Sequence, residues 1–403
     1  MNKKISLGAV IAIIFITAAV TLSITYVMTM NKFDSELSQT SAYQTVYKKL
    51  SEIDKKVREE YMGTIDEKTL VDGIAEGYLS GIGDKYAMYR DSDKKKLNDD
   101  EFEGNAVGIG IIGAASKDGK GVYVLEVMKG SPASTAGIQK GDVITRVADA
   151  KLEGLTLDEA IGHIAGRVDE RRRIVVDRGG DSKVFEVTIR KYENITVFYD
   201  TIDKSTGYVK ITEFLQNTDK QFSDAIEDLK SKGVTSVVFD VRNNLGGSVD
   251  AVCSVLDGLI PAGKIMSTTD KNGKTEVYRN SDSKQLDMSM TVLVNDRSAS
   301  AAEIFACVLR DYKKAKLVGE KTYGKCTMQT SYTLPDRSEI SVSTHTIIPP
   351  VTENYEGKGL IPDFPVSLNE EQRKEFSFLT FKDDPQIIKA VEVMGDPLLY
   401  KFD

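Results

Sequence analysis

Two side chains that can perform covalent catalysis, Ser300 and Lys325, each occupy a turn between regular elements. Ser300 follows a β-branched, apolar stretch (residues 291–294), and helical apolar spacing begins at Ala301. Lys325 lies in a glycine-containing loop after a second β-rich stretch (residues 315–319). A serine on one turn and a lysine on the next predict a Ser–Lys dyad, in which the amine activates the hydroxyl.

The same spacing permits a structural alternative at the start of this helix. Ser300 and Glu303 stand three residues apart ahead of an apolar helix, which is the pattern of a capping box. In that arrangement the serine accepts from the first helical N–H groups and the glutamate reaches back to the serine N–H. Spacing alone therefore leaves both a cap and a nucleophile open at Ser300.

A histidine base is nearly excluded by the composition. The chain has only two histidines, His163 and His345, and no acid–histidine pairing or two-histidine metal motif can be recognised in their spacing. A lysine base must be uncharged near neutral pH, although the reference pKa of its amine is about 10.4. Because burial disfavours the ammonium, we expect Lys325 in a dry site that is free of a close carboxylate. Gln329, four residues further on, could orient the amine without adding charge.

Three stretches together resemble the catalytic core of the carboxyl-terminal processing peptidases, which are tail-specific serine proteases. They are SASAAEIFA (residues 298–306), DYKKAKLVGEKTYGK (residues 311–325) and the following Gln329. The resemblance implies that Ser300 is the nucleophile, Lys325 the base and Gln329 its orienting partner. Lys321 has no counterpart in the family pattern, and we expect it to be a solvated loop residue.

A glycine pair follows the buried strand predicted at VTSVVFDV (residues 234–241). The stretch Arg242-Asn243-Asn244-Leu245-Gly246-Gly247 is similar to the family's Asp-x-Arg-x-Asn-x-Gly-Gly motif. The resemblance implies an oxyanion hole made by the backbone N–H of Ala301 and that of Gly246 or, alternatively, Gly247. A helix start that needs unusual dihedral angles would also require glycine, and both interpretations can hold together.

A second unit, residues 102–192, begins with the glycine-rich run VGIGIIG (residues 107–113). Its G-x-G-x-x-G spacing is formally a dinucleotide fingerprint, but a further strand follows where that motif needs a helix. The unit instead resembles a PDZ domain, which binds a free chain end as an added strand and holds its carboxylate in a glycine loop. The same glycines could serve only a tight turn. The resemblance assigns tail binding to Val107, Gly108, Ile109, Gly110 and Ile111, beside a predicted helix at residues 157–165.

The N-terminal segment predicts a membrane anchor. Lys3 and Lys4 precede residues 5–30, which carry no charged side chain and are long enough to cross a bilayer as a helix. A cleavable signal peptide is the alternative, although the apolar run exceeds a usual signal core. We expect a single-pass protein of the cell membrane with its catalytic part outside the cytoplasm.

Charge and cysteine content limit the partners. The chain has 403 residues with 53 basic and 61 acidic side chains, a net charge of −8, which argues against nucleic acid as a partner. Its three cysteines give no disulfide framework. Cys326 directly follows Lys325, where most relatives have glycine. Its thiol could perturb the lysine or be oxidised, but filling space is the favoured role. No cofactor or metal is expected.

The chain is therefore predicted to be an α+β multidomain protein. Its parts are a cytoplasmic N-terminus with a transmembrane helix, an N-terminal helical region, a PDZ domain, an α/β serine-protease core and a C-terminal helical tail. The family's terminal helices suggest a homodimer. The corresponding boundaries are residues 1–32, 33–101, 102–192, 193–367 and 368–403.

These observations predict a membrane-anchored serine endopeptidase that recognises free C-terminal tails and cleaves extracytoplasmic proteins. Whether the PDZ domain delivers the substrate or also blocks the site is left open. Departures from the family pattern at Arg297, Leu245 and Cys326 keep an alternative: a tethered binding protein in which the PDZ domain is the working part and Ser300 is only a cap.

Overall fold

The computed structural model describes residues 7–282 and 284–395, with the side chains of residues 7–15, 19 and 30–42 also left out. The chain divides into two compact units, Met1–Gly73 and Ile74–Asp403. The first unit holds α1 (Leu7–Glu60) and the start of α2 (Glu67–Gly81). None of the described helices combines the length and the apolar character that spanning a bilayer requires. The structure thus lends no support to the predicted anchor at residues 5–30, and residues 1–6 lie outside the description.

The start of the second unit is helical as predicted, with one exception. After α2 comes the short strand β1 (Met88–Arg90), and α3 (Ser92–Phe102) follows. β1 pairs antiparallel with β18 (Glu339–Ile348), and Met88 stands opposite Ser341. A partner strand from far along the chain thus overrides the local helical pattern, a tertiary effect that periodicity cannot reveal.

The predicted PDZ domain, hereafter the PDZ region, is a small β-sheet with two helices. The sheet order is β3-β4-β5-β7-β8, with β6 paired to β5, and a separate pair, β2 and β9, flanks it. Alternating apolar residues of the strands and one face of α5 form its core, around Val124, Ile144 and Ile174. The elements are β2 (Asn105–Gly108), β3 (Ile111–Ala115), β4 (Val122–Val127), α4 (Pro132–Ala136), β5 (Val143–Val147), β6 (Ala150–Lys151), α5 (Leu157–Ile164), β7 (Arg171–Arg178), β8 (Asp181–Thr188) and β9 (Arg190–Glu193).

The predicted protease core, hereafter the protease region, is built on a six-stranded sheet of order β10-β11-β12-β15-β16-β19. All neighbours are parallel except β10 and β11. Successive side chains of a strand point to opposite faces, so Val237 and Phe239 pack on the face that carries α6, α7 and α8, whereas Val238 packs against α10. The elements are β10 (Val197–Thr201), β11 (Thr206–Ile211), α6 (Thr218–Ser231), β12 (Ser236–Asp240), α7 (Val249–Asp257), β15 (Ser289–Val294), α8 (Ala301–Asp311), β16 (Ala315–Gly319) and β19 (Phe364–Pro365).

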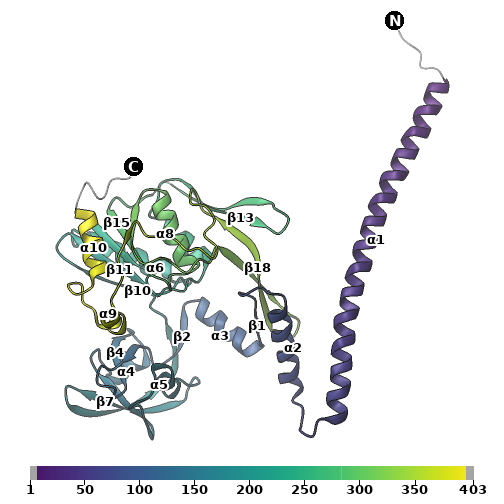
Figure 1. The fold of residues 1–403 in the computed structure, drawn as a ribbon. Coiled ribbons are helices and arrows are strands. Elements are labelled where there is room, and N and C mark those ends of the chain that lie inside the picture. The colour runs from purple at the N-terminus through teal and green to yellow at the C-terminus, as the bar shows by residue number, and fades with distance from the viewer. Residues whose placement is uncertain (1–6, 283, 396–403) are drawn as a thin grey trace. The chain divides into compact units, whose positions relative to one another are not determined.

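A second sheet of the same region adjoins the loop that carries Lys325. It contains β13 (Gly263–Asp270), β14 (Thr275–Ser281), β17 (Thr327–Thr333) and β18, with β1 at one edge. The C-terminal part folds back onto the first sheet as α9 (Glu370–Lys374), a 3-10 turn η1 (Phe376–Phe378) and α10 (Pro385–Gly395) (Figure 1). The predicted tail thus contains three short helical elements joined by turns, and residues 396–403 lie outside the description.

Candidate active site

Three adjacent strands bring the predicted catalytic residues together. β12, β15 and β16 are parallel neighbours, so their carboxyl ends meet at one edge of the sheet. The loop after β12 carries Gly246, the turn after β15 carries Ser300, and the loop after β16 carries Lys325. The carboxyl edge of a parallel sheet is the usual place for a site in such folds.

Ser300 stands at the N-terminus of α8 in a rare backbone conformation. Its φ of 55° and ψ of −116° lie in a region that non-glycine residues seldom adopt. Gly246 lies directly against it, because a Cβ added at Gly246 would be 2.8 Å from the Ser300 Cβ and 3.1 Å from the Ala301 nitrogen. The elbow therefore needs a residue without a side chain at position 246.

Glu303 links the backbone of the predicted nucleophile to that of the predicted base. Its Oε2 accepts from the N–H of Ser300 at 3.0 Å and from the N–H of Lys325 at 2.8 Å. Its Oε1 accepts from the Thr322 hydroxyl at 2.5 Å and from the N–H of Gly324 at 2.7 Å. The side chain is fully buried, and burial raises the pKa of the carboxyl, although these donors oppose the rise. The hydrogen bond from the Ser300 N–H to Glu303 that the capping box predicts is thus present. Glu303 also accepts from the loop after β16, outside its own helix.

Lys325 is partly buried, and burial lowers the pKa of its amine below the ordinary value. Three carboxylates, those of Glu356, Asp84 and Glu303, oppose this shift by favouring the ammonium. The expectation of a site without a close carboxylate is therefore wrong, although the effect of burial is the larger one. The amine lies over the ring of Tyr86, 4.6 Å from the ring centre. Such a contact with the ring face attracts a cation and also covers it from water.

Gln329 does not hydrogen-bond to Lys325 in this structure. Its Nε2 donates to the Ser343 hydroxyl at 3.0 Å, across the β17–β18 ladder in which the two residues are opposite each other. Ser300 and Lys325, both within the described chain, make no side-chain hydrogen bond to each other. Resting active sites often have such loose geometry, which tightens only when substrate binds.

The glycine pair after β12 offers two candidate oxyanion donors, and they differ in their bonding. The N–H of Gly246 donates to Asn244 Oδ1 at 2.8 Å, and Asn244 in turn donates to the carbonyl oxygen of Ile211. For Gly247 no acceptor of its N–H is found within the described residues. A Cβ on Gly247 would come within 2.2 Å of the Phe214 carbonyl oxygen, so only glycine fits there.

The predicted tail-binding loop leads into an exposed sheet edge. β3 is the terminal strand of the PDZ sheet, so its outer side can accept an added peptide strand. Ile109 is buried in the core that α5 shares, and Ile111 begins β3. Val107 and Gly108, by contrast, pair with β9.

Gly110 also forms a tight turn, which was the alternative role expected for the loop glycines. It has a φ of 81°, and a Cβ there would lie 2.1 Å from the Ser131 Cβ. The Ser131 hydroxyl donates to the Gly110 carbonyl oxygen at 3.2 Å. A tight turn packed on α4 therefore requires this glycine, whatever binds at the loop.

Four residues for which the sequence predicted no catalytic role have other surroundings or partners. Lys321 is exposed. His345 lies on β18 and contacts Thr344, and His163 lies on α5 of the PDZ region. Cys326 is fully buried and its thiol donates to the carbonyl oxygen of Ile347, while burial raises its pKa to about 11, so it fills space as an inert thiol. In the described part of the chain no group of three or more His, Cys, Asp or Glu side chains could hold a metal ion.

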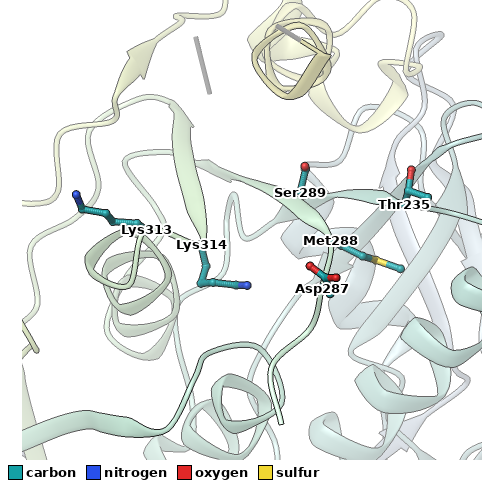
Figure 2. Close-up of a pocket in the computed structure, with 6 residues that line it drawn as sticks. All are labelled: Thr235, Asp287, Met288, Ser289, Lys313 and Lys314. Atoms are coloured by element: carbon teal, nitrogen blue, oxygen red, sulfur yellow. The ribbon is translucent and has the colours of Figure 1, made fainter. Parts of the chain in front are cut away.

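A cavity of about 310 Å³ in the protease region lies away from this site. It is lined by the segment leading into β15, by Thr235, and by the residues that follow α8. The Lys314 side chain extends toward Asp287, and that of Lys313 extends away from it (Figure 2). The cavity is at the amino end of β15, whereas Ser300 follows the carboxyl end, so it is not part of the catalytic arrangement.

Sequence reasoning missed three residues next to the base: Asp84, Tyr86 and Glu356. The first two belong to the stretch GDKYAMYRDSD (residues 83–93), to which the sequence assigned no catalytic role. Glu356 binds the N–H of Cys326 at 2.6 Å and the Tyr86 hydroxyl at 3.0 Å. No local pattern could have linked these segments to Lys325, because they are distant in sequence.

Comparison with known proteins agrees with this architecture. Residues 205–366 match peptidase family S41, and residues 99–170 match the PDZ domain family. The chain is 30% identical over 397 residues to the carboxy-terminal processing protease CtpA of Bacillus subtilis (strain 168), covering 96% of this chain and 84% of that protein. It is also 30% identical over 404 residues to a Staphylococcus aureus (strain COL) protein named "Probable CtpA-like serine protease", covering 98% of this chain and 80% of that protein.

A solved structure shares the fold. A Bacteroides fragilis protein titled as an S41 protease superposes with a TM-score of 0.58 at 18% identity, covering 83% of this chain and 91% of that one. The matches to named proteases set aside the alternative of a tethered binding protein. The chain belongs to peptidase family S41, as a serine-type, PDZ-containing carboxy-terminal processing protease.

Proposed function

We propose that this protease cleaves peptide bonds with a Ser300–Lys325 dyad. Ser300 Oγ attacks the scissile carbonyl carbon while the neutral Lys325 amine takes the hydroxyl proton, and the resulting ammonium later protonates the leaving amine. Water then hydrolyses the acyl-enzyme, with the same amine as its base. The observation that carries the proposal is the shared Glu303 oxygen, which ties the backbones of both residues within one buried network.

The electrostatics of the base support this chemistry. Burial lowers the pKa of Lys325, which raises the fraction of neutral amine near neutral pH. Since no hydrogen bond joins the two side chains at rest, catalysis requires the amine to swing from the Tyr86 ring toward Ser300. A lysine side chain has enough rotatable bonds for that movement.

We propose that Ala301 and Gly247 supply the oxyanion donors. The earlier preference for Gly246 would require its N–H to leave Asn244, to which it already donates. The N–H of Gly247 has no acceptor among the described residues and is therefore available to an oxyanion. Ala301 is the first residue of α8, and the N–H groups at the N-terminus of a helix favour negative charge. Each donor to a developing oxyanion is worth about 10²–10³ in kcat.

We propose that the substrates are proteins or peptides with exposed C-termini. The open edge of β3 and the glycine loop before it are the features that hold a chain end in other PDZ domains. The test compares one peptide with a free and with an amidated C-terminus. Preferential cleavage of the free form supports tail recognition, and equal cleavage of both forms contradicts it.

We further propose that the catalytic part works outside the cytoplasm and is tethered through residues 5–30. The support is the sequence, which carries no charged side chain over this stretch. Fractionation of cells that express the full chain tests the tether. Release by high salt or recovery in the soluble fraction would contradict it.

We also propose a homodimer through the N-terminal helices. Apolar side chains of α1, including Tyr43, Tyr47 and Ile53, are exposed to solvent. Light scattering of the purified chain and of a variant with these three residues changed to serine measures the mass. A dimer that the variant loses supports the proposal, and a monomeric parent contradicts it.

Three single variants test the dyad. Ser300→Ala and Lys325→Ala should each abolish cleavage of an unfolded test protein and leave the urea midpoint unchanged. Lys321→Ala, a matched control on the same loop, should remain active because its side chain is exposed. An active Lys325→Ala with an inactive Lys321→Ala would show that the base has been misplaced. A serine-directed phosphonate should label the parent and Lys321→Ala, but neither Ser300→Ala, which lacks the hydroxyl, nor Lys325→Ala, which lacks the base that activates it.

A further inference from the structure

We propose that Asp84 and Tyr86, from the N-terminal region, are positioning residues of the catalytic base. At rest, Asp84 orients Gln329 through Ser343 and Tyr86 covers the amine of Lys325, and both come from a segment far from these residues in the sequence. This inference rests on the proposed Ser–Lys chemistry, and its test is arranged so that the two can fail separately.

Asp84 reaches Gln329 through one intermediate residue. Its carboxylate accepts from the backbone N–H of Ser343 at 2.8 Å and from the Ser343 hydroxyl at 3.0 Å. The same hydroxyl oxygen accepts from Gln329 Nε2 at 3.0 Å. With its proton committed to Asp84, the hydroxyl can only accept from the carboxamide. Asp84 thereby sets which end of the Gln329 side chain faces β18, and it leaves the carbonyl oxygen of that side chain available to the Lys325 amine.

Tyr86 covers the amine of the base. Its ring centre is 4.6 Å from Lys325 Nζ, and its hydroxyl donates to Glu356 Oε1 at 3.0 Å. The other oxygen of Glu356 accepts from the N–H of Cys326, the residue after the base. One carboxylate therefore fixes both the ring that covers the amine and the backbone that carries it.

The segment that carries these two side chains is itself anchored. Asp84 accepts from the N–H of Tyr86, which closes a local turn, and Lys85 pairs with Glu356 at 3.2 Å. Directly after it, β1 pairs with β18, where Arg90 binds Glu339 at 2.8 Å with both side chains largely buried. The segment is thus held on the strand that also carries Ser343, so it has a defined position relative to the base.

The groups that face Lys325 act in opposite directions. The carboxylates of Glu356, Asp84 and Glu303 favour its charged form, and the neighbouring ammonium of Lys85 disfavours it. The face of the Tyr86 ring attracts the ammonium, but the ring also excludes water from it, and burial is the strongest of these influences and disfavours the charged form. Loss of the ring and loss of the Asp84 charge should therefore shift the titration of the base in opposite directions.

The test is the pH dependence of kcat/KM for a short peptide substrate, measured on the full chain. Tyr86→Ala admits water to the amine, so its acid limb should move to higher pH, with a loss of about tenfold near pH 7 that recovers in alkali. Asp84→Asn removes a carboxylate that favours the ammonium, so its acid limb should move to lower pH. Its kcat should nevertheless fall, because Asn at position 84 can also donate to Ser343 and so release Gln329.

Matched variants separate positioning from folding. Tyr86→Phe keeps the ring and should keep the acid limb of the parent, even if the lost bond to Glu356 lowers the rate. Tyr332→Ala removes an exposed tyrosine from β17, the strand of Gln329, and should leave both the rate and the profile unchanged. The urea midpoint of each variant is recorded, and if Tyr86→Ala does not fold, the downward shift of Asp84→Asn decides the outcome.

The outcomes are distinct for the two proposals. If Lys325→Ala is active, the dyad itself is wrong. If Lys325→Ala is inactive but folded variants at positions 84 and 86 keep the acid limb of the parent, the dyad stands and the positioning roles are refuted. Shifts of both variants in the same direction also overturn the inference, because they show a general loosening of the site.

Discussion

Glu303 shows how much of the candidate active site depends on one side chain. The four groups that donate to Glu303 come from the turn of Ser300 and from the loop of Lys325. A fully buried carboxylate is costly to desolvate, and this cost is offset only because both oxygens are satisfied. The sequence identified it as a capping glutamate, which is only its shortest-range role.

Replacement of Glu303 by glutamine should separate geometry from folding. The carboxamide keeps one acceptor oxygen but directs an NH₂ group at N–H donors, so Ser300 and Lys325 should drift apart and kcat should fall about 10²-fold. Glu303→Ala leaves four buried donors unpaired and should also lower the free energy of unfolding by about 1–3 kcal/mol or more. Activity assays and urea unfolding measure both, with Glu353→Gln as an exposed control. A fully active Glu303→Gln would contradict the role given to this residue.

The rate should follow the titration of Lys325 in a defined direction. Only the neutral amine can act as base, so kcat/KM should rise as the pH passes upward through the pKa of Lys325. Burial lowers that pKa, so the midpoint of the acid limb should lie below the ordinary lysine value of 10.5. A pH profile of kcat/KM with a peptide substrate measures it. A midpoint at or above 10.5 would show a solvated, charged lysine that is no base at neutral pH.

At the scale of elements, the site exists because β12, β15 and β16 are parallel neighbours whose next loops are short enough to meet. Each strand was recognisable from its apolar run, and the predicted start of α8 at Ala301 agrees with the structure. The neighbour relations were not recognisable, because side-chain periodicity says that a strand is buried but not what it pairs with. The same limit explains why β1 was taken for part of a helical region.

The glycine turn after β12 gives a prediction at this scale. In Gly246→Ala the new methyl group would press on the Ser300 Cβ at 2.8 Å, and the φ of 111° disfavours any side chain. Displacement of the nucleophile should lower kcat about 10²-fold or more, with a folded protein. Gly258→Ala, at the end of α7 with ordinary contacts and a φ of −76°, is the matched control and should behave as the parent. An active Gly246→Ala would mean that the elbow is less tightly packed than the structure shows.

At the scale of the protease region, a buried ionic network fastens the C-terminal part to the catalytic sheet. Arg242, directly after β12, bonds to Asp240 and also reaches Asp384 at 2.8 Å and Gln386 at 2.7 Å, at the start of α10. All are almost fully buried. Burial is the strongest single influence and would raise the pKa of Asp240, but the charge and hydrogen bonds of Arg242, together with Lys210 and Tyr208, lower that pKa overall. The glycine turn next to Arg242 thus depends on the last helix of the described chain.

Removal of this arginine should destabilise the fold more than it alters the chemistry directly. Arg242→Ala leaves buried carboxylates without their cation and should lower the free energy of unfolding at pH 7 by about 3–5 kcal/mol. Arg279→Ala breaks an exposed pair with Asp250 and should cost about 1 kcal/mol or less. Urea unfolding measures both. Equal effects of the two variants would contradict the anchoring role.

The same network predicts a loss of stability in acid. The folded pKa of Asp240 lies below its unfolded value of 3.8, so its contribution is present above that pH and is lost as the pH falls through the lowered folded pKa. The urea midpoint of the parent should therefore drop below about pH 4. In Arg242→Ala this part of the acid dependence should vanish, and an unchanged pH dependence in the variant would assign it to other carboxylates.

The sequence by itself predicted the groups that we propose for the chemistry, and it identified the modules that carry them. With two histidines and no metal motif, a serine at a helix start and a lysine after a strand were the chemistry available, and local patterns located both. Only the tertiary structure decided what surrounds them: that one oxygen of Glu303 joins both backbones, that the Gly246 N–H is already engaged, and that Asp84 and Tyr86 stand beside the base. Those relations depend on strand order and long-range packing, and the periodicity of a local stretch indicates neither of them.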